Sequence, residues 1–491
     1  MLVRHSARRL GDCALRSCET PMFVRTVVLL LLPALASAAP NIVFMMADDL
    51  GWNDVGYHGS EIKTPNIDAL VEQGVELDRY YAFPLCSPTR VALMTGRSPI
   101  RQGVDSPIGP NGGLPLDEHL LPQTLRAAGY ETFMAGKWHL GIERIASHPY
   151  RRGFDRSYGH LGAAVDYFTH RWLGGLDWHR NGEVLREEGY STELITSEAL
   201  DQLRTRDKSK PMFLYVAFNA PHTPLQATET YLKRYPNVEG NRRLFAAMVS
   251  AMDDGVGKIL AALEMEGIAD DTLVVWVSDN GGGIRAGASN EPFRGGKGSA
   301  FEGGIRVPGA VRWNGVLTAG SKLEQQFSAH DWFPTLTSAV GVEPQNVKPF
   351  DGVDMWPALE DGTAVARSET VIGVDGNYAI FRDGWKLVEF TPRNSNQTTM
   401  HLYRFEDDPS EEHDLIEVKP DLATELLARM RSIPRPPSVS QDVQPRGPRP
   451  GAPTKGAPKA KKGRGGRGAR DPQAGWPDET REPWIDTALR D

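Results

Sequence analysis

The sequence predicts an α/β protein with a large sheet covered by helices on both faces, and a smaller α+β unit near the C-terminus. Two observations predict this class. Up to about residue 370, short continuous apolar runs alternate with helical segments, which is typical of buried, mostly parallel strands. Beyond that point the runs become short strands separated by turn residues, and one helix follows them. The chain has 491 residues, 40% of them hydrophobic, so it can bury large cores.

Four apolar runs in the first part are predicted to be buried strands, at residues 41–47, 131–135, 212–218 and 273–277. Helices are predicted between them. Thr64-Pro65 begins one helix, and Gly74 ends it. A second, long amphipathic helix is predicted at residues 243–266. Because strands and helices alternate, the helices are expected on both faces of one sheet.

The smaller unit is predicted over residues 370–433. Its strands are expected at residues 371–374, 378–382, 385–390 and 401–404, and its helix at residues 421–431. Residues 434–491 form a basic tail rich in proline and glycine, with nine lysines and arginines and no acids between Arg446 and Arg470. This composition cannot bury enough apolar area to fold, so the tail is predicted to be disordered. It is either a solvated linker or a segment that holds polyanionic substrates.

The N-terminal 38 residues have the order of a signal peptide. Arg25 precedes the short apolar run from Val27 to Leu35, and the small residues Ala36-Ser37-Ala38 follow it. Residues 1–21 form an extension before a second possible start at Met22. We therefore expect a protein of the secretory pathway, extracellular or lysosomal, without a transmembrane anchor. A membrane anchor or a misplaced start is the alternative interpretation.

Cysteine usage and charge narrow the function. Cleavage after Ala38 removes Cys13 and Cys18 and leaves Cys86 alone, so an internal disulfide is excluded. The sequon Asn396-Gln397-Thr398 is consistent with a secreted glycoprotein. The formal net charge is −8, and the body is more acidic still because the leader and the tail are basic. An acidic body argues against nucleic-acid binding, and an anionic substrate would need cations within the site.

Polar side chains follow the four predicted strands of the first domain, residues 39–369. They are Asp48 and Asp49, Lys137 and His139, His222, and Asp279 and Asn280. Ligands of open α/β sheets bind outside the carboxyl ends of the strands, so these side chains are expected to form one site. Each residue alone is weak evidence for a site, because an Asp at a strand end is more often a cap or turn residue. Together, the oxygen ligands Asp48, Asp49, Asp279 and Asn280 suit Ca²⁺ or Mg²⁺ rather than Zn²⁺.

The segment around Cys86 is predicted to begin a helix. Pro88 suits the first turn and Ser87 suits the cap. Cys86 would then lie at the helix N-terminus, where backbone N–H groups favour an anion. Arg90 follows one turn later and can fold back toward it. The alternative is a buried structural cysteine before an ordinary helix.

These segments together resemble the signatures of type I sulfatases, over residues 41–433. The matching motifs are Cys86-Ser87-Pro88-Thr89-Arg90, Leu93-Met94-Thr95-Gly96-Arg97, Gly136-Lys137-Trp138-His139-Leu140-Gly141, the pairs Asp48-Asp49 and Asp279-Asn280, and Lys297 within Arg294-Gly295-Gly296-Lys297-Gly298. Residues 152–155 and 221–226 look most like the arylsulfatase B (N-acetylgalactosamine-4-sulfatase) branch. The resemblance implies an alkaline-phosphatase-like fold: a large mixed sheet flanked by helices, plus a small C-terminal domain with an antiparallel sheet.

The resemblance also implies a function, the hydrolysis of sulfate monoesters of a carbohydrate, a glycosaminoglycan or an aryl compound. A formylglycine-generating enzyme of the secretory pathway would oxidise Cys86 to formylglycine (3-oxoalanine), an aldehyde whose hydrated form is the nucleophile. One Ca²⁺ would be held by Asp48, Asp49, Asp279, Asn280 and the modified Cys86. Arg90 and Lys137 would hold the hydrated aldehyde. Lys297 and His222 would bind the sulfate and assist the leaving oxygen, and His139 would act as the base.

Two other functions remain as alternatives. One is a phosphatase or phosphodiesterase of the same superfamily, and the other is a non-catalytic protein that binds sulfated glycans. Members of the first class use Ser or Thr as nucleophile, often with two zinc ions, so Cys86 in its Cys-x-Pro-x-Arg motif argues against it. The second class would lack a nucleophile or a ligand, and none is missing here. The sequence departs from some arylsulfatases at Ala163 and Ala164, where they have a serine, and this change is expected to weaken sulfate binding or shift the substrate.

Overall fold

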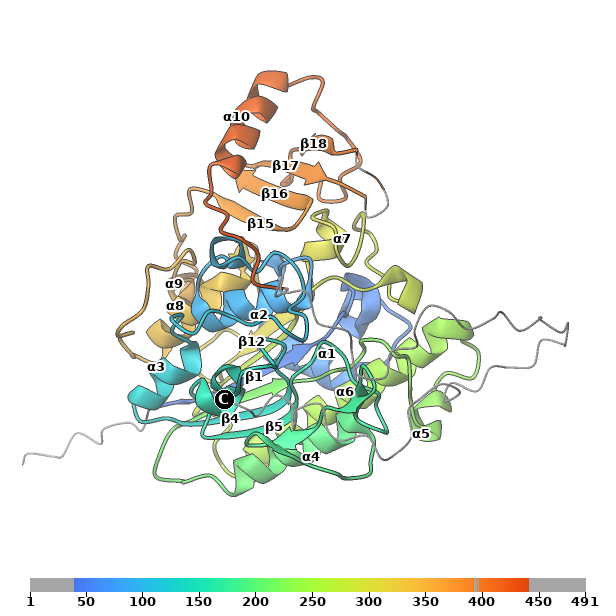
Figure 1. Ribbon diagram of the computed structural model, residues 1–491, viewed down its shortest axis with the longest axis vertical. Helices are drawn as coiled ribbons and strands as arrows, with labels where there is room; N and C mark the ends of the chain where they lie inside the picture. The colour runs from blue at the N-terminus through green and yellow to red at the C-terminus, as the bar shows by residue number, and fades with distance from the viewer. Residues whose placement is uncertain (1–38, 393–394, 396, 441–491) are drawn as a thin grey trace, which may run out of the picture. The chain divides into compact units, whose positions relative to one another are not determined.

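The computed structural model describes residues 39–392, 395 and 397–440. The predicted signal peptide, Asn396 of the sequon and the tail beyond residue 440 lie outside the described residues. Within the described chain, a ten-stranded sheet forms the centre of the fold, and a four-stranded sheet follows it in sequence (Figure 1). None of the helices in these ranges is both long and apolar enough to cross a membrane.

The large sheet is mixed. Its strands are β1 (Asn41–Ala47), β2 (Val75–Leu77), β4 (Glu131–Lys137), β5 (Arg156–His160), β8 (His179–Arg180), β9 (Glu183–Val184), β10 (Met212–Ala217), β11 (Thr272–Ser278), β12 (Gly309–Arg312) and β13 (Ser321–Leu323). They lie in the order β13-β2-β12-β11-β1-β10-β4-β5-β8-β9. The five central strands, from β11 to β5 in this order, are parallel, while β12 pairs antiparallel with β11 and β8 pairs antiparallel with β5. The predicted fold class is confirmed.

Helices cover both faces of this sheet. The two faces can be told apart along β1, whose side chains alternate between two hydrophobic cores. Ile42, Phe44 and Met46 belong to one core, and Val43 and Met45 belong to the other. The first core contains residues of α2 (Cys86–Thr95), α3 (Leu121–Ala127), α7 (Glu302–Ile305), α8 (Trp332–Ala339) and α9 (Trp356–Glu360). The second contains residues of α1 (Pro65–Glu72), α4 (Ser191–Arg204), α5 (Glu229–Leu232) and α6 (Gly240–Met265).

The small sheet is an antiparallel meander. Its strands are β15 (Thr370–Val374), β16 (Asn377–Arg382), β17 (Trp385–Phe390) and β18 (Thr399–Tyr403), and α10 (Pro420–Arg431) follows them. One face, with Ile380 and Leu387, packs against α10. The other face, with Phe381 and Val388, joins the first core of the large sheet. The two sheets therefore share a continuous hydrophobic interface.

Short two-stranded pairs complete the secondary structure. They are β3 (Tyr80–Tyr81) with β14 (Phe327–Ser328), and β6 (Arg171–Trp172) with β7 (Gly175–Leu176). Sequence periodicity had not predicted any of these two-residue strands.

One expected boundary is wrong. The tail was predicted to be disordered from Pro434 onward, but residues 434–440 pack against the body. The N–H of Val439 donates to the carbonyl of Gly103 at 2.9 Å, and the carbonyl of Ser440 accepts from the N–H of Gly109 at 2.8 Å. Val439 also packs against the first core. These backbone bonds and one apolar side chain order a segment whose composition alone predicts disorder.

Candidate active site

The four predicted strand ends meet at the same edge of the large sheet. Asp48 and Asp49 follow β1, Lys137 ends β4, and Asp279 follows β11, while His222 lies in the loop after β10. These strands are direct neighbours, since β1 pairs with both β10 and β11, and β10 pairs with β4. The juxtaposition of these side chains follows from strand order, because parallel strands deliver their carboxyl ends to one edge.

Asp48 contacts both a cation and the thiol. Lys137 Nζ donates to Asp48 Oδ2 at 2.6 Å, and Cys86 Sγ lies 3.4 Å from Asp48 Oδ1. Arg90 Nη2 lies 4.0 Å from the same oxygen. The side chains of Asp48, Lys137 and Arg90 have no solvent exposure. Charges buried this deeply require partners, and each has one here.

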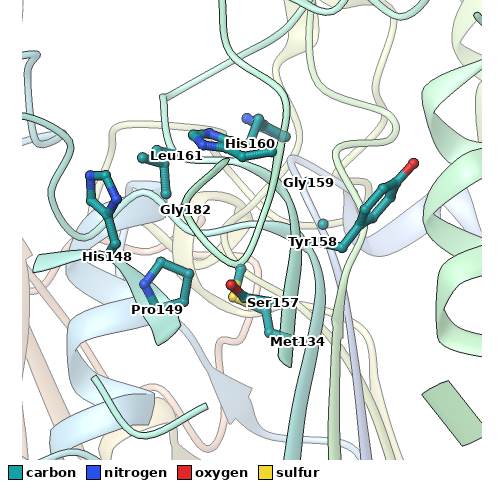
Figure 2. Close-up of a pocket in the computed structure, with 11 residues that line it drawn as sticks. Met134, His148, Pro149, Ser157, Tyr158, Gly159, His160, Leu161 and Gly182 are labelled. Carbon is teal, nitrogen blue, oxygen red and sulfur yellow. The ribbon is translucent and has the colours of Figure 1, made fainter. Parts of the chain in front are cut away.

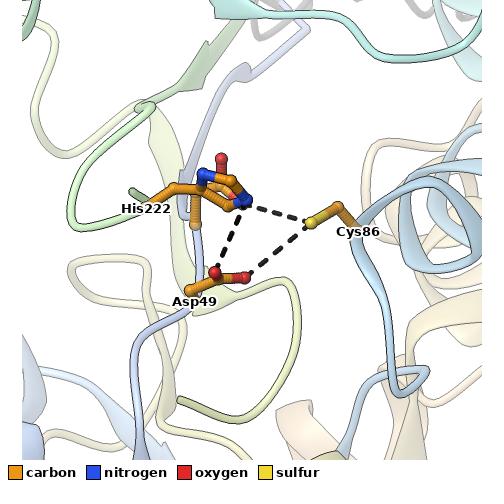
Figure 3. A group of neighbouring side chains, drawn as sticks. Asp49, Cys86 and His222 are labelled. Carbon is orange, nitrogen blue, oxygen red and sulfur yellow. Dashed lines mark hydrogen bonds and ion pairs between the residues drawn. The ribbon is translucent and has the colours of Figure 1, made fainter. Parts of the chain in front are cut away.

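Asp49 is surrounded in the same way (Figure 3). Lys297 Nζ donates to its Oδ2 at 2.6 Å, and His222 Nε2 lies 3.6 Å from that oxygen. Cys86 Sγ lies 3.8 Å from Asp49 Oδ1, which also accepts from Asn280 Nδ2 at 2.8 Å. The backbone of Asp49 has a φ of 70°, which is uncommon for a residue with a side chain and is concentrated at functional sites.

Cys86 lies at the N-terminus of α2, as predicted, but it is the first residue of the helix, and Ser87 is not the cap. The cap position is Leu85, and no side chain caps the helix. Ser87 lies within the first turn, where its Oγ donates to the carbonyl of His139 at 3.0 Å and accepts from the N–H of Ile108 at 2.9 Å. The Ser87 hydroxyl therefore ties the helix to the loop that carries His139.

Arg90 connects three strand ends. Its Nη2 and Nε donate to Asp279 Oδ2 at 2.8 and 3.2 Å, and its Nη1 donates to the carbonyl of Lys137 at 2.9 Å. Its Nη1 also donates to the hydroxyl of Tyr215, on β10, at 3.4 Å. The guanidinium thus fixes the end of β11 relative to β4 and β10, in addition to its charge.

The carboxylates of the site titrate differently. Burial raises the pKa of Asp48, but the charges of Lys137, His222 and other cations outweigh it and hold that pKa well below its ordinary value. Burial, together with the negative charge of Asp48, raises the pKa of Asp279 to about 7, although Arg90 opposes the rise. Burial and the Asp279 carboxylate also raise the pKa of the Cys86 thiol, so it donates to Asp48 as a neutral S–H.

Both histidines have a defined proton position. His139 Nε2 lies 3.2 Å from the carbonyl of Ile108, and His222 Nδ1 lies 2.6 Å from the carbonyl of Thr223. A carbonyl only accepts, so these nitrogens carry the hydrogen, and the other ring nitrogen of a neutral imidazole has the free lone pair. Burial, followed by the charge of Lys137, lowers the pKa of His139 well below its ordinary value. His139 Nδ1 is buried and has no hydrogen-bond partner among the described residues.

The oxygen ligands fit a metal ion. Ligand atoms of Asp48, Asp49, Cys86 and His222 all lie within 4.8 Å of one another. Asn280 Oδ1 is buried and accepts no hydrogen bond within the described ranges, and its free acceptor suits a cation. Carboxylate and amide oxygens are the ligands that Ca²⁺ prefers. His222 is the member that the predicted set of oxygen ligands did not include, and Asp279 of that set is not among these four residues.

Sequence reasoning missed a histidine behind Lys137. His160, on β5, pairs in register with Lys137 and lines a cavity of about 10 Å³ together with His148 and His179 (Figure 2). Neither ring nitrogen of His160 has a hydrogen-bond partner in the described part of the chain, and the side chain is 1% exposed. The cavity has room for about one water molecule. β5 is short and polar, so periodicity provides no signal that would have found His160.

A second missed residue holds His222. The hydroxyl of Tyr167 lies 2.6 Å from the carbonyl of Asn219 and 2.8 Å from the carbonyl of His222. Tyr167 is buried, and burial raises its pKa well above the ordinary value, so it remains a neutral donor. A tyrosine in an irregular loop has no motif that would mark it before the fold is known.

A sheet edge that gathers carboxylates, cations and a thiol defines an α/β enzyme for anionic substrates. The family model described as Sulfatase matches residues 40–342. Mouse arylsulfatase J is 39% identical over 362 residues, which cover 71% of this chain and 60% of that protein, so the match spans well under the full length of this relative. Rat N-acetylgalactosamine-6-sulfatase is 36% identical over 386 residues, covering 72% of each chain.

Solved structures of similar fold lead to the same family. The crystal structure of Ps i-CgsB in complex with k-i-k-neocarrahexaose superposes with a TM-score of 0.74 at 36% identity, covering 80% of this chain and 92% of that one. PsFucS1 sulfatase from Pseudoalteromonas sp. superposes with a TM-score of 0.69 at 26% identity, covering 81% and 92%. The chain belongs to the sulfatase family.

Proposed function

We propose that this chain hydrolyses sulfate monoesters of a sulfated carbohydrate, with a formylglycine made from Cys86 and one bound Ca²⁺. The observation that carries the proposal is the position of Cys86 Sγ, 3.4 Å from Asp48 and 3.8 Å from Asp49 at the N-terminus of α2. A residue placed there touches both carboxylates that would hold the metal. Helix N-termini also favour negative charge, which suits an anionic substrate.

Asp48, Asp49, Asp279 and Asn280, with the modified residue 86, would hold the ion. When bound, Ca²⁺ polarises oxygen atoms and offsets negative charge. Three carboxylates (Asp48, Asp49 and Asp279) face three cations (Lys137, Lys297 and Arg90), so the ionised side chains balance one another without a metal. A divalent cation would change this neutral set to a net charge of about +2, which attracts a sulfate group.

Formylglycine, once formed and hydrated, would supply the hydroxyl that attacks sulfur, and the ester oxygen of the substrate would leave as the alcohol. Loss of a proton from the second hydroxyl of residue 86 would then expel sulfate and restore the aldehyde. The chain's cations would stabilise the charge that develops on the sulfate oxygens. Lys137 and Arg90 are fully buried and fixed by Asp48 and Asp279, so they would orient residue 86. Lys297 is 22% exposed in its side chain and reaches Asp49 from the open side, so it would bind the sulfate itself.

The two histidines would move protons. His139 is neutral with a free Nδ1, as a base must be, and we assign it the removal of a proton from residue 86. His222 Nε2 faces Asp49, and its protonated form would donate to the leaving oxygen. Burial lowers the pKa of His222, whereas the Asp49 carboxylate raises it. The carboxylate therefore helps His222 to hold the proton that a general acid needs.

The substrate is proposed to be a carbohydrate sulfate. Relatives named N-acetylgalactosamine-6-sulfatase and the neocarrahexaose-bound structure support a sugar ester. We keep the prediction of the arylsulfatase B branch, with small aryl sulfates as artificial substrates. Ala163 and Ala164 leave no side-chain hydroxyl at the position where some arylsulfatases have a serine, so a weaker or shifted sulfate contact is expected there. We also propose export through the secretory pathway, where the formylglycine-generating enzyme acts.

The test begins with the tryptic peptide from Tyr80 to Arg90 of protein secreted by a eukaryotic host. A mass below that of the thiol form, together with reactivity toward a hydrazide, is expected. The same protein should release sulfate from 4-nitrophenyl sulfate, and Cys86→Ala should abolish the release. Faster release from 4-nitrophenyl phosphate would favour the phosphatase alternative. An unmodified thiol, in a host that converts a control sulfatase, would favour the glycan-binding alternative.

A further inference from the structure

A buried ion cluster lies between the small sheet and the body, outside the site described above. We call it the Lys386 cluster, and it consists of Lys386, Glu302 and Glu411. Lys386 Nζ lies 2.7 Å from Glu302 Oε1 and 2.7 Å from Glu411 Oε1. None of the three side chains is more than 1% exposed. Buried charges are costly to desolvate, so such a cluster persists only where the surrounding structure fixes its geometry.

The three members come from different parts of the fold. Glu302 is the first residue of α7, Lys386 lies on β17, and Glu411 lies in the loop between β18 and α10 (Figure 1). The backbone N–H and both carboxylate oxygens of Glu302 have partners in or beside the cluster. Its N–H donates to Glu411 Oε2 at 2.8 Å, and its Oε2 accepts from the hydroxyl of Tyr81 at 2.9 Å. The start of α7 is therefore held by β17, by the loop between β18 and α10, and by β3.

The loop before α7 carries Lys297. Its backbone is fastened to the active site, because the N–H of Gly298 donates to the carbonyl of Pro84 at 2.9 Å, and the N–H of Lys297 donates to the carbonyl of Gly282 at 3.2 Å. Pro84 lies two residues before Cys86, and Gly282 lies two residues after Asn280. The loop thus bridges the small sheet and both sides of the catalytic cluster.

The loop begins at a second tie to the small sheet. Arg294 Nη1 donates to the hydroxyl of Tyr403, on β18, at 2.6 Å. The guanidinium of Arg294 also lies 4.1 Å from the ring centre of Phe301, which packs against Phe390 of β17 at 5.3 Å. The N–H of Gly303 donates back to the carbonyl of Arg294 at 2.8 Å, which closes the loop. Both ends of the Lys297 loop are therefore attached to the small sheet.

We propose that Lys386 and Glu411 are positioning residues for Lys297, acting through Glu302 and the loop of residues 294–302. Lys297 has no helix or strand of its own, yet its Nζ must stay 2.6 Å from Asp49 in order to face the sulfate. Lys386 and Glu411 add rigidity from the small sheet and the loop after it, beyond the backbone bonds that Lys297 and Gly298 make at the active site. The inference rests on the sulfate-binding role proposed above for Lys297.

The experiment compares Lys386→Met with a matched control, Arg429→Met. Arg429 belongs to the same unit, but its ion pair with Glu369 is exposed and touches neither α7 nor the loop. Amide hydrogen exchange is measured over residues 294–305, together with kcat and KM for 4-nitrophenyl sulfate and the mass of the peptide from Tyr80 to Arg90. In Lys386→Met, we expect exchange at least about 10-fold faster in the loop alone, and KM raised at least about 10-fold with unchanged formylglycine content.

Several outcomes would overturn the proposal. Unchanged exchange and KM in a folded Lys386→Met protein would show that the cluster does not hold the loop. Equally faster exchange in β1 and β10 would show general destabilisation instead of positioning. In the Lys297→Met background, Lys386→Met should have little further effect on kcat/KM, whereas an independent, additive loss would contradict the coupling.

Two further variants test the proposal if Lys386→Met does not fold or needs a control for its charge. If Lys386→Met does not fold, Tyr403→Phe removes only the hydroxyl that accepts from Arg294, and an increase of about 3-fold in loop exchange is expected. Lys386→Arg keeps the charge and should restore part of the protection. A wild-type protein without sulfatase activity would contradict the proposed function alone, because the exchange measurement needs no turnover.

Discussion

Removal of Ca²⁺ tests the proposed metal site without enzyme turnover. A ligand that binds only the folded protein stabilises it by RT ln(1 + [L]/Kd). Calcium sites of extracellular modules have Kd values of about 10⁻⁴ to 10⁻³ M. At about 10 mM Ca²⁺, the free energy of unfolding should therefore rise by about 1.4 to 2.7 kcal/mol. With about 400 described residues, this corresponds to a rise in Tm of about 2 to 3 °C relative to protein in excess chelator.

The variant Asn280→Ala makes this measurement specific. Asn280 Oδ1 has no hydrogen-bond partner among the residues described, so the metal-free protein loses nothing through that atom. The bonds from Asn280 Nδ2 to the Asp49 carboxylate and to the carbonyl of Gly281 are lost, at a cost of roughly 2 to 4 kcal/mol. The Ca²⁺-dependent rise in Tm should fall below about 1 °C. Differential scanning calorimetry with and without chelator measures both effects.

A matched control separates ligand loss from general damage. Asn290 is also buried, but its amide oxygen accepts from the N–H of Gly282 and its amide nitrogen donates to the carbonyl of Gly282. Asn290→Ala should be destabilised and still keep the full Ca²⁺-dependent rise in Tm. An equal rise in wild type and Asn280→Ala, or no rise in wild type, would refute the ligand assignment.

Two more predictions concern the loops and the stability of the fold. In Tyr167→Phe, the loss of the hydroxyl that bonds the backbone at His222 should reduce kcat/KM about 10-fold, measured on 4-nitrophenyl sulfate, and unchanged kinetics would exclude this role. Burial raises the pKa of Asp253 to about 6, so the folded state binds this proton more tightly than the unfolded state. Its contribution, up to about 3 kcal/mol, should be complete below about pH 4 and lost as the pH rises through 6. Urea unfolding of wild type and Asp253→Asn across this pH range should show the slope in the difference between their free energies of unfolding, because the contributions of the other buried carboxylates cancel.

The central strands could be predicted because burial on both faces leaves a clear signature. β1 matches the predicted run at residues 41–47, and β10 and β11 match within one residue at each end. These strands end in the polar residues of the site, so strand order alone brings Asp48 and Asp279 together although 231 positions separate them. The polar residues of that edge, and the metal site proposed there, were therefore accessible from local patterns.

The remaining features depend on long-range packing. β2 and β8 have three and two residues, too few for a period to be recognised, and they exist because a neighbouring strand pairs with them. The hydroxyl of Ser87 was expected to cap α2, yet it bonds the backbone of His139 instead, because the loop after β4 packs against the first turn. His160 and Tyr167 belong to the same class, since only the folded chain places them beside Lys137 and His222.

The three cations of the site are held in different ways, and this difference matters for how the family site can vary. Arg90 lies within α2 and Lys137 ends β4, so the core of the large sheet fixes both. Lys297 lies in an irregular loop that depends on Glu302 and, through it, on Lys386 of the small sheet. A change in the small sheet should therefore alter the sulfate binding proposed for Lys297 and leave Cys86 and the proposed metal ligands in place. On the proposed coupling, substitutions in the C-terminal unit should raise KM and leave kcat largely unchanged.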